Sequence, residues 1–353
     1  MSRSFVNVWV AAALLAGAGG PARASEAHGR DLAAVMTNDV TANTLNVYDA
    51  HSGQLLQALP THGKGGAGGN ARGVRQFDNR VVATVNFGSN SVAIFRRDGD
   101  RLRFDGLVTT SSPPVSVDFG NGHLYVAGTT TVDSFAMHNG QVGSLDGSAT
   151  LLLAGGGVPE DGSTAQVGVI SNKQLLVTLK GPDPGTVDVV SLRDGAVDGD
   201  PVAVAAPGNS LTPFGFVTNP DGTALITLAH SDENGLFRDG AFAAVTAAQQ
   251  GAPCWMTRVG KYVFVANTGS HTVSRLVGTG SHVFVDAVVA AVTPGAAADV
   301  DAADGVLAVV DHDAGQSHVS LFTYNQFGEV SIAAPPVTVG TANANGVAII
   351  AAR

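Results

Sequence analysis

Residues 81–99 read VVATVNFGSNSVAIFRRDG, which has the pattern of a strand, a polar turn and a second strand. The first apolar run ends at Asn86, the second begins at Val92, and GSN at residues 88–90 supplies the turn. A similar stretch recurs at residues 262–280, YVFVANTGSHTVSRLVGTG, with NTGS in place of NFGS. Two copies so far apart in one chain indicate an internal repeat, and this repeat determines the predicted fold.

Aligning the chain on the polar turn after each apolar strand yields seven repeats. The turns are 38 to 52 residues apart, near Asn38, Asn86, Gly128, Lys180, Ala229, Asn267 and Asp311. This spacing is typical of propeller blades, which are about 40–50 residues long. Most repeats contain four short strand signals; in the second repeat they occupy residues 73–77, 81–85, 91–96 and 101–107. Several of these strands are apolar on both faces, as expected of sheets covered on both sides by neighbouring blades.

The two ends of the chain predict how the ring closes. The first repeat begins at residues 32–36, which resemble a second strand, so its innermost strand is missing. The chain ends with NGVAIIA at residues 345–351, which resembles an innermost strand with nothing after it. We therefore expect an all-β fold, a seven-bladed β-propeller of four-stranded antiparallel blades, closed by the C-terminal strand completing the first blade. Closure removes the open sheet edge that would invite aggregation.

The first residues have the features of a secretion signal. Arg3 is followed by an apolar stretch at residues 5–15, and ARA at residues 22–24 offers a cleavage site. An uncleaved anchor is the alternative, although Gly and Pro at residues 17–21 would break a helix early. No later apolar run is long enough to span a bilayer, so we expect no membrane contact after cleavage.

Domain organisation and charge follow from this assignment. We expect a signal peptide at residues 1–24, one propeller domain at residues 25–353, and a periplasmic or secreted protein. The formal net charge is −10, and cleavage makes it −12 because it removes Arg3 and Arg23 but no acid. With four lysines and no basic cluster, the chain lacks the electrostatic features of a nucleic-acid-binding protein. The single cysteine, Cys254, excludes an intrachain disulfide.

Two glycine-rich insertions, at residues 60–71 and 154–164, separate an outer strand from the next inner strand. Each is interpreted either as a flexible surface loop or as a rim loop over the central channel. Neither has the strand-to-helix order of a phosphate-binding loop, so no cofactor site is predicted. Asp311, His312 and Asp313 alternate in direction along a strand and cannot easily converge, so no metal site is predicted either.

Several motifs resemble a known family. They are the NFGS and NTGS turns, TPFGF at residues 212–216, and APCW at residues 252–255 followed by YVFVAN at residues 262–267. Together they resemble the seven-bladed lactonase-like β-propellers, which include the propeller-type 6-phosphogluconolactonase and the fungal carboxymuconate cyclase. The resemblance covers nearly the whole mature chain. It implies a central-channel site for a lactone or a lactone-forming acid, with His, Arg and Glu of rim loops and inner strands in the chemistry.

Opening a lactone requires a base that activates water and a cation or donors that hold the carbonyl oxygen as it gains charge. Inner strands and the loops before them face the channel, where the sequence offers His62, Lys64, Arg72, Arg75, Glu160, Arg258 and Asp299. We predict His62 or Glu160 as the base and Arg72 or Arg258 as the oxyanion partner. The alternative is that Arg72 and Arg258 form solvated ion pairs in a water-filled channel.

Two functions are therefore compatible with the sequence. The first is an exported enzyme that hydrolyses or forms a lactone of a sugar acid or muconate-type acid, with its small-molecule ligand in the central channel. The second is a non-catalytic propeller that binds a small ligand or a protein partner. The second has support because Leu179 stands where the family stretch has Glu, and residues 157–166 contain no His. Cys254 is predicted to be a buried structural thiol.

Overall fold

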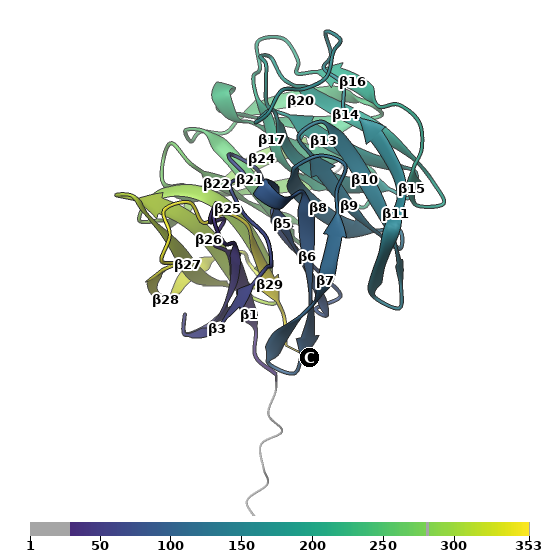
Figure 1. Ribbon diagram of the computed structural model, residues 1–353. Helices are drawn as coiled ribbons and strands as arrows, with labels where there is room; N and C mark the ends of the chain where they lie inside the picture. The colour runs from purple at the N-terminus through teal and green to yellow at the C-terminus, as the bar shows by residue number, and fades with distance from the viewer. Residues whose placement is uncertain (1–28, 280–281, 353) are drawn as a thin grey trace, which may run out of the picture.

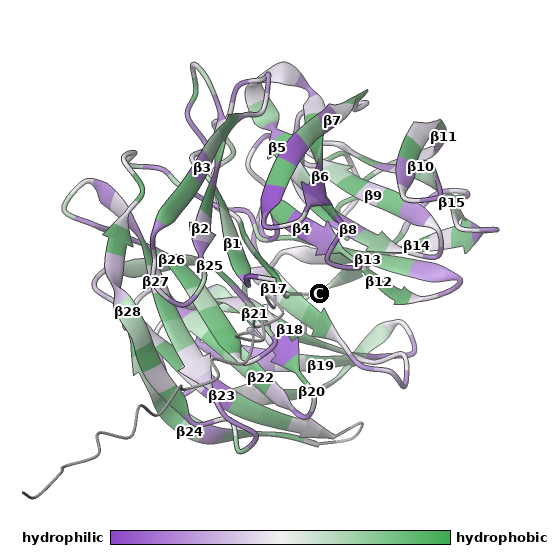
Figure 2. Cartoon of the chain, turned by 90° about the horizontal axis from the view of Figure 1, so that it is seen from below, coloured by the Kyte–Doolittle hydropathy of each residue, from purple (hydrophilic) through white to green (hydrophobic). Residues whose placement is uncertain are grey.

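The computed structural model describes residues 29–279 and 282–352, and these form seven β-sheets arranged as blades around a central axis (Figures 1 and 2). The predicted seven-bladed propeller is confirmed. The predicted signal peptide at residues 1–24 lies outside the described residues. Within the described part of the chain, no helix is long and apolar enough to cross a membrane.

The blades are numbered in chain order, and their strands are named from the channel outward. Blade 1 contains β29 (Val347–Ile350), β1 (Leu32–Met36), β2 (Thr44–Asp49) and β3 (Leu55–Pro60). Blade 2 contains β4 (Val74–Phe77), β5 (Val81–Asn86), β6 (Ser91–Asp98) and β7 (Arg101–Thr109). Blade 3 contains β8 (Pro114–Gly120), β9 (His123–Gly128), β10 (Thr131–His138) and β11 (Gln141–Thr150).

The remaining blades repeat this order. Blade 4 contains β12 (Thr164–Ser171), β13 (Gln174–Leu179), β14 (Thr186–Arg193), β15 (Ala196–Val197) and β16 (Val202–Ala205). Blade 5 contains β17 (Pro213–Thr218), β18 (Ala224–Leu228), β19 (Glu233–Arg238) and β20 (Ala241–Ala247). Blade 6 contains β21 (Pro253–Val259), β22 (Tyr262–Asn267), β23 (Thr272–Thr279) and β24 (His282–Val292). Blade 7 contains β25 (Ala296–Ala303), β26 (Val306–Asp313), β27 (Gln316–Tyr324) and β28 (Val330–Thr338).

Blade 4 departs from the predicted four strands. Its outer strand is divided, because β16 pairs with the first half of β14 and the short β15 pairs with the end of β14. The turn between β5 and β6 is also more structured than predicted. Phe87–Ser89 forms a 3-10 turn, η1, and Asn90 closes it with φ +47°, a left-handed conformation that Asn tolerates. A second turn of this kind, η2, spans Ala229–Ser231.

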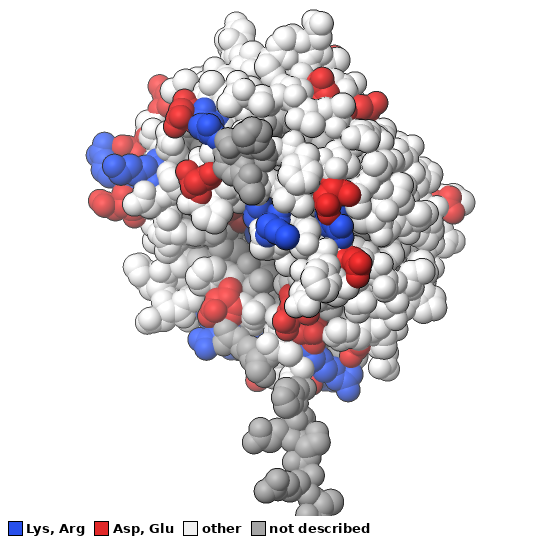
Figure 3. All heavy atoms as spheres, turned by 180° about the vertical axis from the view of Figure 1, so that it is seen from behind, with Lys and Arg blue, Asp and Glu red and all other residues white. Residues whose placement is uncertain are grey.

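The apolar core lies between the blades. All six residues of β5 are buried, as its apolar character on both faces predicted. One cluster joins Met36 of blade 1, Val82 of blade 2 and Val117 of blade 3, so each sheet is covered by its neighbours. The surface shown in Figure 3 is sparsely charged, and its Lys and Arg side chains lie beside Asp and Glu rather than in a basic patch.

The ring closes as predicted. β29 pairs antiparallel with β1, with Leu32 opposite Ile350 and Val35 opposite Val347. The other edge of β29 has no strand partner, and its N–H groups donate to side chains of blade 7. Val347 donates to Asp299 at 3.3 Å, and Ile349 donates to Asp301 at 2.9 Å. The closing strand is therefore bonded on both edges, as a buried strand requires.

Truncating the closing strand should destabilise the ring. Ile349 is fully buried, so Ile349→Ala should lower the free energy of unfolding by about 2–5 kcal/mol. Ile332 is 75% exposed on β28, so the matched control Ile332→Ala should change it by less than about 0.5 kcal/mol. Urea unfolding monitored by tryptophan fluorescence measures both. Equal effects of the two substitutions would contradict closure by β29.

Candidate functional site

Residues 70–72, here called the plug, cross the central channel between blades 2 and 4. Asn70 is fully buried; its carbonyl accepts from the Trp255 indole N–H at 2.9 Å, and its side chain bonds to Val115 and Asn345. The Ala71 N–H donates to Ala165 of β12 at 3.0 Å. These partners belong to blades 1, 3, 4 and 6, so the plug is held from several sides of the ring.

Glycines allow the chain to enter the channel. Residues 61–69 lead from β3 to the plug, and the Asn38 side chain bonds to the backbone N–H groups of residues 66 and 67 at 2.7 and 3.0 Å. A Cβ atom on Gly65 would lie 2.3 Å from the Asn38 backbone, so no larger residue fits there. Of the two interpretations of this insertion, a rim loop and a flexible surface loop, the structure supports the first.

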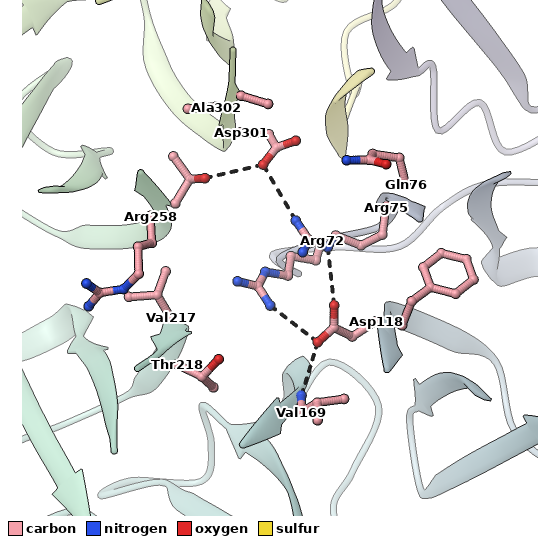
Figure 4. A pocket seen from close by; sticks show the side chains of 13 residues that line it. Arg72, Arg75, Gln76, Asp118, Val169, Val217, Thr218, Arg258, Asp301 and Ala302 are labelled. Atoms are coloured by element: carbon pink, nitrogen blue, oxygen red, sulfur yellow. Dashed lines mark hydrogen bonds and ion pairs between the residues drawn. The ribbon is translucent and has the colours of Figure 1, made fainter. Parts of the chain in front are cut away.

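Below the plug lies a cavity of about 340 Å³, here called the Arg72 cavity (Figure 4). Its wall contains Arg72, Arg75, Asp118, Arg258 and Asp301, and all but Arg72 lie on innermost strands near their C-terminal ends. Figure 4 shows the Arg72 side chain extending into the open space and Arg75 lying between the two carboxylates.

Asp118 and Asp301 have two roles in this cavity. Each caps a backbone N–H on the unpaired edge of the next innermost strand: Asp118 accepts from Val169 at 3.0 Å, and Asp301 accepts from Ile349. Each also pairs with Arg75, at 3.3 Å and 3.5 Å. Burial lowers the pKa of Arg75, but the two carboxylates outweigh this effect and leave that pKa raised.

The positive charges of the other two arginines, Arg72 and Arg258, are less well balanced by nearby carboxylates. The nearest carboxylate contact recorded for Arg72 is 3.7 Å, to Asp118, and burial lowers the pKa of Arg72 to about 10. The Arg258 Nη1 donates to the Gly260 carbonyl at 3.3 Å, whereas its buried Nε and Nη2 have no hydrogen-bond partner among the described residues. Burial also lowers the pKa of Arg258. Arg72 thus forms one loose ion pair, as the alternative predicted, whereas Arg258 forms none with a carboxylate among the described residues.

On the other side of the plug lies a larger cavity of about 510 Å³, here called the Lys180 cavity. Its wall comes from the starts of innermost strands, from the turns after the second strands β13 and β18, and from the glycine-rich loop before β12. It includes Glu160, Lys180, Phe214, His230 and Cys254. It therefore opens at the opposite end of the channel from the Arg72 cavity. Both glycine-rich insertions lie at this end.

Lys180 is the most perturbed cation in the Lys180 cavity. Its ammonium donates to the carbonyls of Gly68, at 3.1 Å, and Gly69, and it lies 5.4 Å from the centre of the Phe214 ring. Burial lowers the pKa of Lys180 to about 8. Cys254 is partly buried, and burial raises the pKa of its thiol to about 11, so it is a neutral thiol at physiological pH.

The structure separates the four predicted site residues. Arg72 and Arg258 line one cavity, and Glu160 lines the other. His62 lies in neither; it is exposed, and its ring centroid is 4.3 Å from that of Phe104 on the outermost strand of blade 2. His62 therefore does not contact Arg72, Glu160 or Arg258 in this conformation.

Sequence reasoning missed three functional-site candidates. Asp118 and Asp301 were not selected, although each is an acid inside an apolar innermost-strand pattern, which is a usable signal. Lys180 was noted only as a turn position. Its signal was the placement of a rare lysine directly after the apolar run LLVTL.

Comparison with known proteins defines the fold. No family model matches the sequence, and no curated protein matches it. Solved structures do match: a Lactobacillus plantarum protein has a TM-score of 0.68 at 16% identity, covering 91% of this chain and 99% of its own. A candidate 6-phosphogluconolactonase of Bacteroides fragilis has a TM-score of 0.62 at 14% identity, covering 94% and 99%. The fold is that of the lactonase-like β-propellers.

A named enzyme is among the solved structures whose fold this chain resembles. The periplasmic gluconolactonase of Pseudomonas aeruginosa has a TM-score of 0.60 at 16% identity, covering 92% of this chain and 100% of its own. At such identities the likeness establishes the fold and assigns no role to any residue. The roles of residues in this seven-bladed propeller must come from its own geometry.

Removing the Asn70 side chain should loosen the plug. Asn70→Ala deletes a buried donor and a buried acceptor, so we expect a loss of about 1–3 kcal/mol in the free energy of unfolding and faster amide exchange at Ala71. Asn343 is exposed, and Asn343→Ala is the matched control. Hydrogen exchange with mass spectrometry measures the effect. Unchanged exchange at Ala71 in the Asn70→Ala protein would show that other contacts hold the plug.

Proposed function

We propose that the protein is an exported enzyme that hydrolyses or forms the lactone of a hydroxy acid, such as a sugar acid or a muconate-type acid, in the Lys180 cavity. The observation that carries this proposal is Lys180, a cation of lowered pKa on the wall of the larger cavity. The likeness in fold to a periplasmic gluconolactonase supports the same class of substrate.

Lys180 is suited to hold the carbonyl oxygen of a lactone. A protonated ammonium group has three N–H donors. Two of them are directed to the carbonyls of Gly68 and Gly69, which fix the position of the nitrogen and leave the third for a ligand. Because the site is partly shielded from water, a donor held in this way stabilises the negative charge that develops on the oxygen during attack.

Glu160 is the base in this proposal. It lies on the same cavity wall as Lys180, which takes the place of the arginine predicted from the sequence. In the hydrolytic direction Glu160 accepts a proton from water, the water oxygen bonds to the carbonyl carbon, and the ring C–O bond breaks as its oxygen gains a proton. Phe214 and Val158 provide an apolar surface for the ring carbons.

Activity should require protonated Lys180. Lysine polarises the carbonyl only in its charged form, so kcat should fall as pH rises through the Lys180 pKa of about 8. Lys180→Met keeps the packing against Phe214 but removes the donor, and should lower kcat about 100-fold or more. The matched control is Lys173→Met, because Lys173 is exposed on a surface turn. The assay is lactone hydrolysis against a panel of aldonolactones and muconolactones.

Two results would contradict this assignment. If the wild-type protein turns over no lactone faster than buffer, the chain is a binding protein rather than an enzyme of this class. If the rate instead rises through pH 8 and Lys180→Met abolishes it, Lys180 acts as the base in its neutral form, and the role given to Glu160 is wrong.

Export follows from the sequence pattern at residues 1–24. Protein recovered from the periplasm or the medium of a bacterial host should begin at Ser25, and its intact mass should show the loss of residues 1–24. A mass that includes these residues, together with recovery in the membrane fraction, would instead show an uncleaved anchor.

A further inference from the structure

We propose that the Arg72 cavity is a second ligand site, which binds a small hydroxylated monocarboxylate with the Arg72 guanidinium receiving the carboxylate. The plug separates this cavity from the Lys180 cavity, so the proposal does not depend on the lactone chemistry proposed above. Its evidence is the charge balance of the wall, the incomplete pairing of Arg72, and the size and polarity of the space.

The Arg72 guanidinium is incompletely paired. Asp118 is the carboxylate nearest to it, at 3.7 Å, but Asp118 already accepts from Arg75 at 3.3 Å and from the Val169 N–H at 3.0 Å. The Arg72 guanidinium donates no hydrogen bond to any of the described residues. The centre of the Phe216 ring lies 5.9 Å from the Arg72 guanidinium carbon. A guanidinium group in a bidentate pair with a carboxylate is much more strongly stabilised than this.

The wall of the Arg72 cavity carries a net positive charge. The wall contains three arginines and two aspartates, which leaves one positive charge. Asp299 lies behind the wall, and burial raises its pKa to about 7, so it offsets little of that charge in mildly acidic solution. A single carboxylate balances one positive charge, whereas a phosphate dianion would leave a buried excess of negative charge.

Neutral polar side chains complete the wall of the Arg72 cavity. Thr218, Thr257 and Gln76 also line the space. The Gln76 side-chain oxygen accepts from the Asn79 N–H at 2.8 Å, which leaves its amide N–H groups as donors. Figure 4 shows Thr218 on the side of the cavity toward which the Arg72 side chain extends. These groups suit the hydroxyls of a polyhydroxy acid, and about 340 Å³ is at the lower end of the volumes of small-molecule sites.

Calorimetric titration tests this inference, with gluconate as the probe and glucitol, its uncharged counterpart, as the control ligand. We expect gluconate to bind and glucitol not to bind. Arg72→Met should weaken gluconate binding at least tenfold, because it removes a charge-assisted bidentate pair. Arg193→Met is the matched control for the loss of one positive charge, since Arg193 is exposed and remote from the cavity. It should leave the affinity unchanged.

Further arms separate the two cavities and the two kinds of anion. Gluconate should still bind to the Lys180→Met protein, and adding Arg72→Met should then remove this binding; a Lys180→Met protein that binds no gluconate would place the ligand in the other cavity and overturn the inference. Inorganic phosphate that binds more tightly than gluconate, with the same dependence on Arg72, would overturn the choice of a carboxylate.

A direct structural readout covers the case in which the Arg72→Met protein does not fold. Wild-type crystals grown with gluconate should show its carboxylate within hydrogen-bond distance of the Arg72 guanidinium. An empty cavity at a gluconate concentration that saturates the titration would overturn the inference, as would equal affinities of the wild-type and Arg72→Met proteins.

Discussion

The antiparallel pairing of β29 with β1 holds seven sheets at a fixed distance from one axis, and the other features of the molecule depend on it. An open ring would leave one edge of β1 without a partner and would uncover the apolar faces of two blades. Closure also gives the innermost strands a common direction. All N-terminal ends of these strands then surround one mouth of the channel, and all C-terminal ends surround the other.

A ring of this kind creates a second requirement, because each innermost strand has one edge that faces the channel and has no strand partner. Here side chains of the preceding blade supply acceptors for that edge. Asp118 serves β12, Gln166 serves β17, and Asp299 and Asp301 serve β29. Two of these acids also attract Arg75 into the channel. The charged lining of the Arg72 cavity is thus a consequence of satisfying the backbone.

The plug then divides the channel into two chemical environments. On one side the carbonyls of Gly68 and Gly69 hold the Lys180 ammonium beside an apolar wall. On the other side Arg72 extends among carboxylates and other arginines. Residues 68–72, the plug and the two glycines before it, therefore position the main cation of each cavity: Arg72 belongs to this segment, and Lys180 is hydrogen-bonded to it. The two proposals concern these two cations separately.

The chain's local patterns determined the architecture. Apolar strands, glycine-containing turns and the spacing between them repeat along the sequence, and a missing first strand with a spare last strand implies closure; the structure confirms each of these features. Such patterns are readable because alternation and turn chemistry act between residues a few positions apart. The same reasoning named Arg72, Arg258 and Glu160 as channel residues, and each lines a cavity in the channel.

Only the tertiary structure decided which of these residues meet. His62 precedes the plug by eight residues, yet its ring contacts Phe104 on the outer strand of a blade, while the Arg72 side chain extends into the Arg72 cavity. The path of the chain between them depends on close contacts with Asn38, Trp255 and Asn345, which come from distant parts of the sequence. Lowered and raised pKa values likewise arise from burial between blades. Composition and spacing carry no record of such long-range contacts, because they form only when the ring closes.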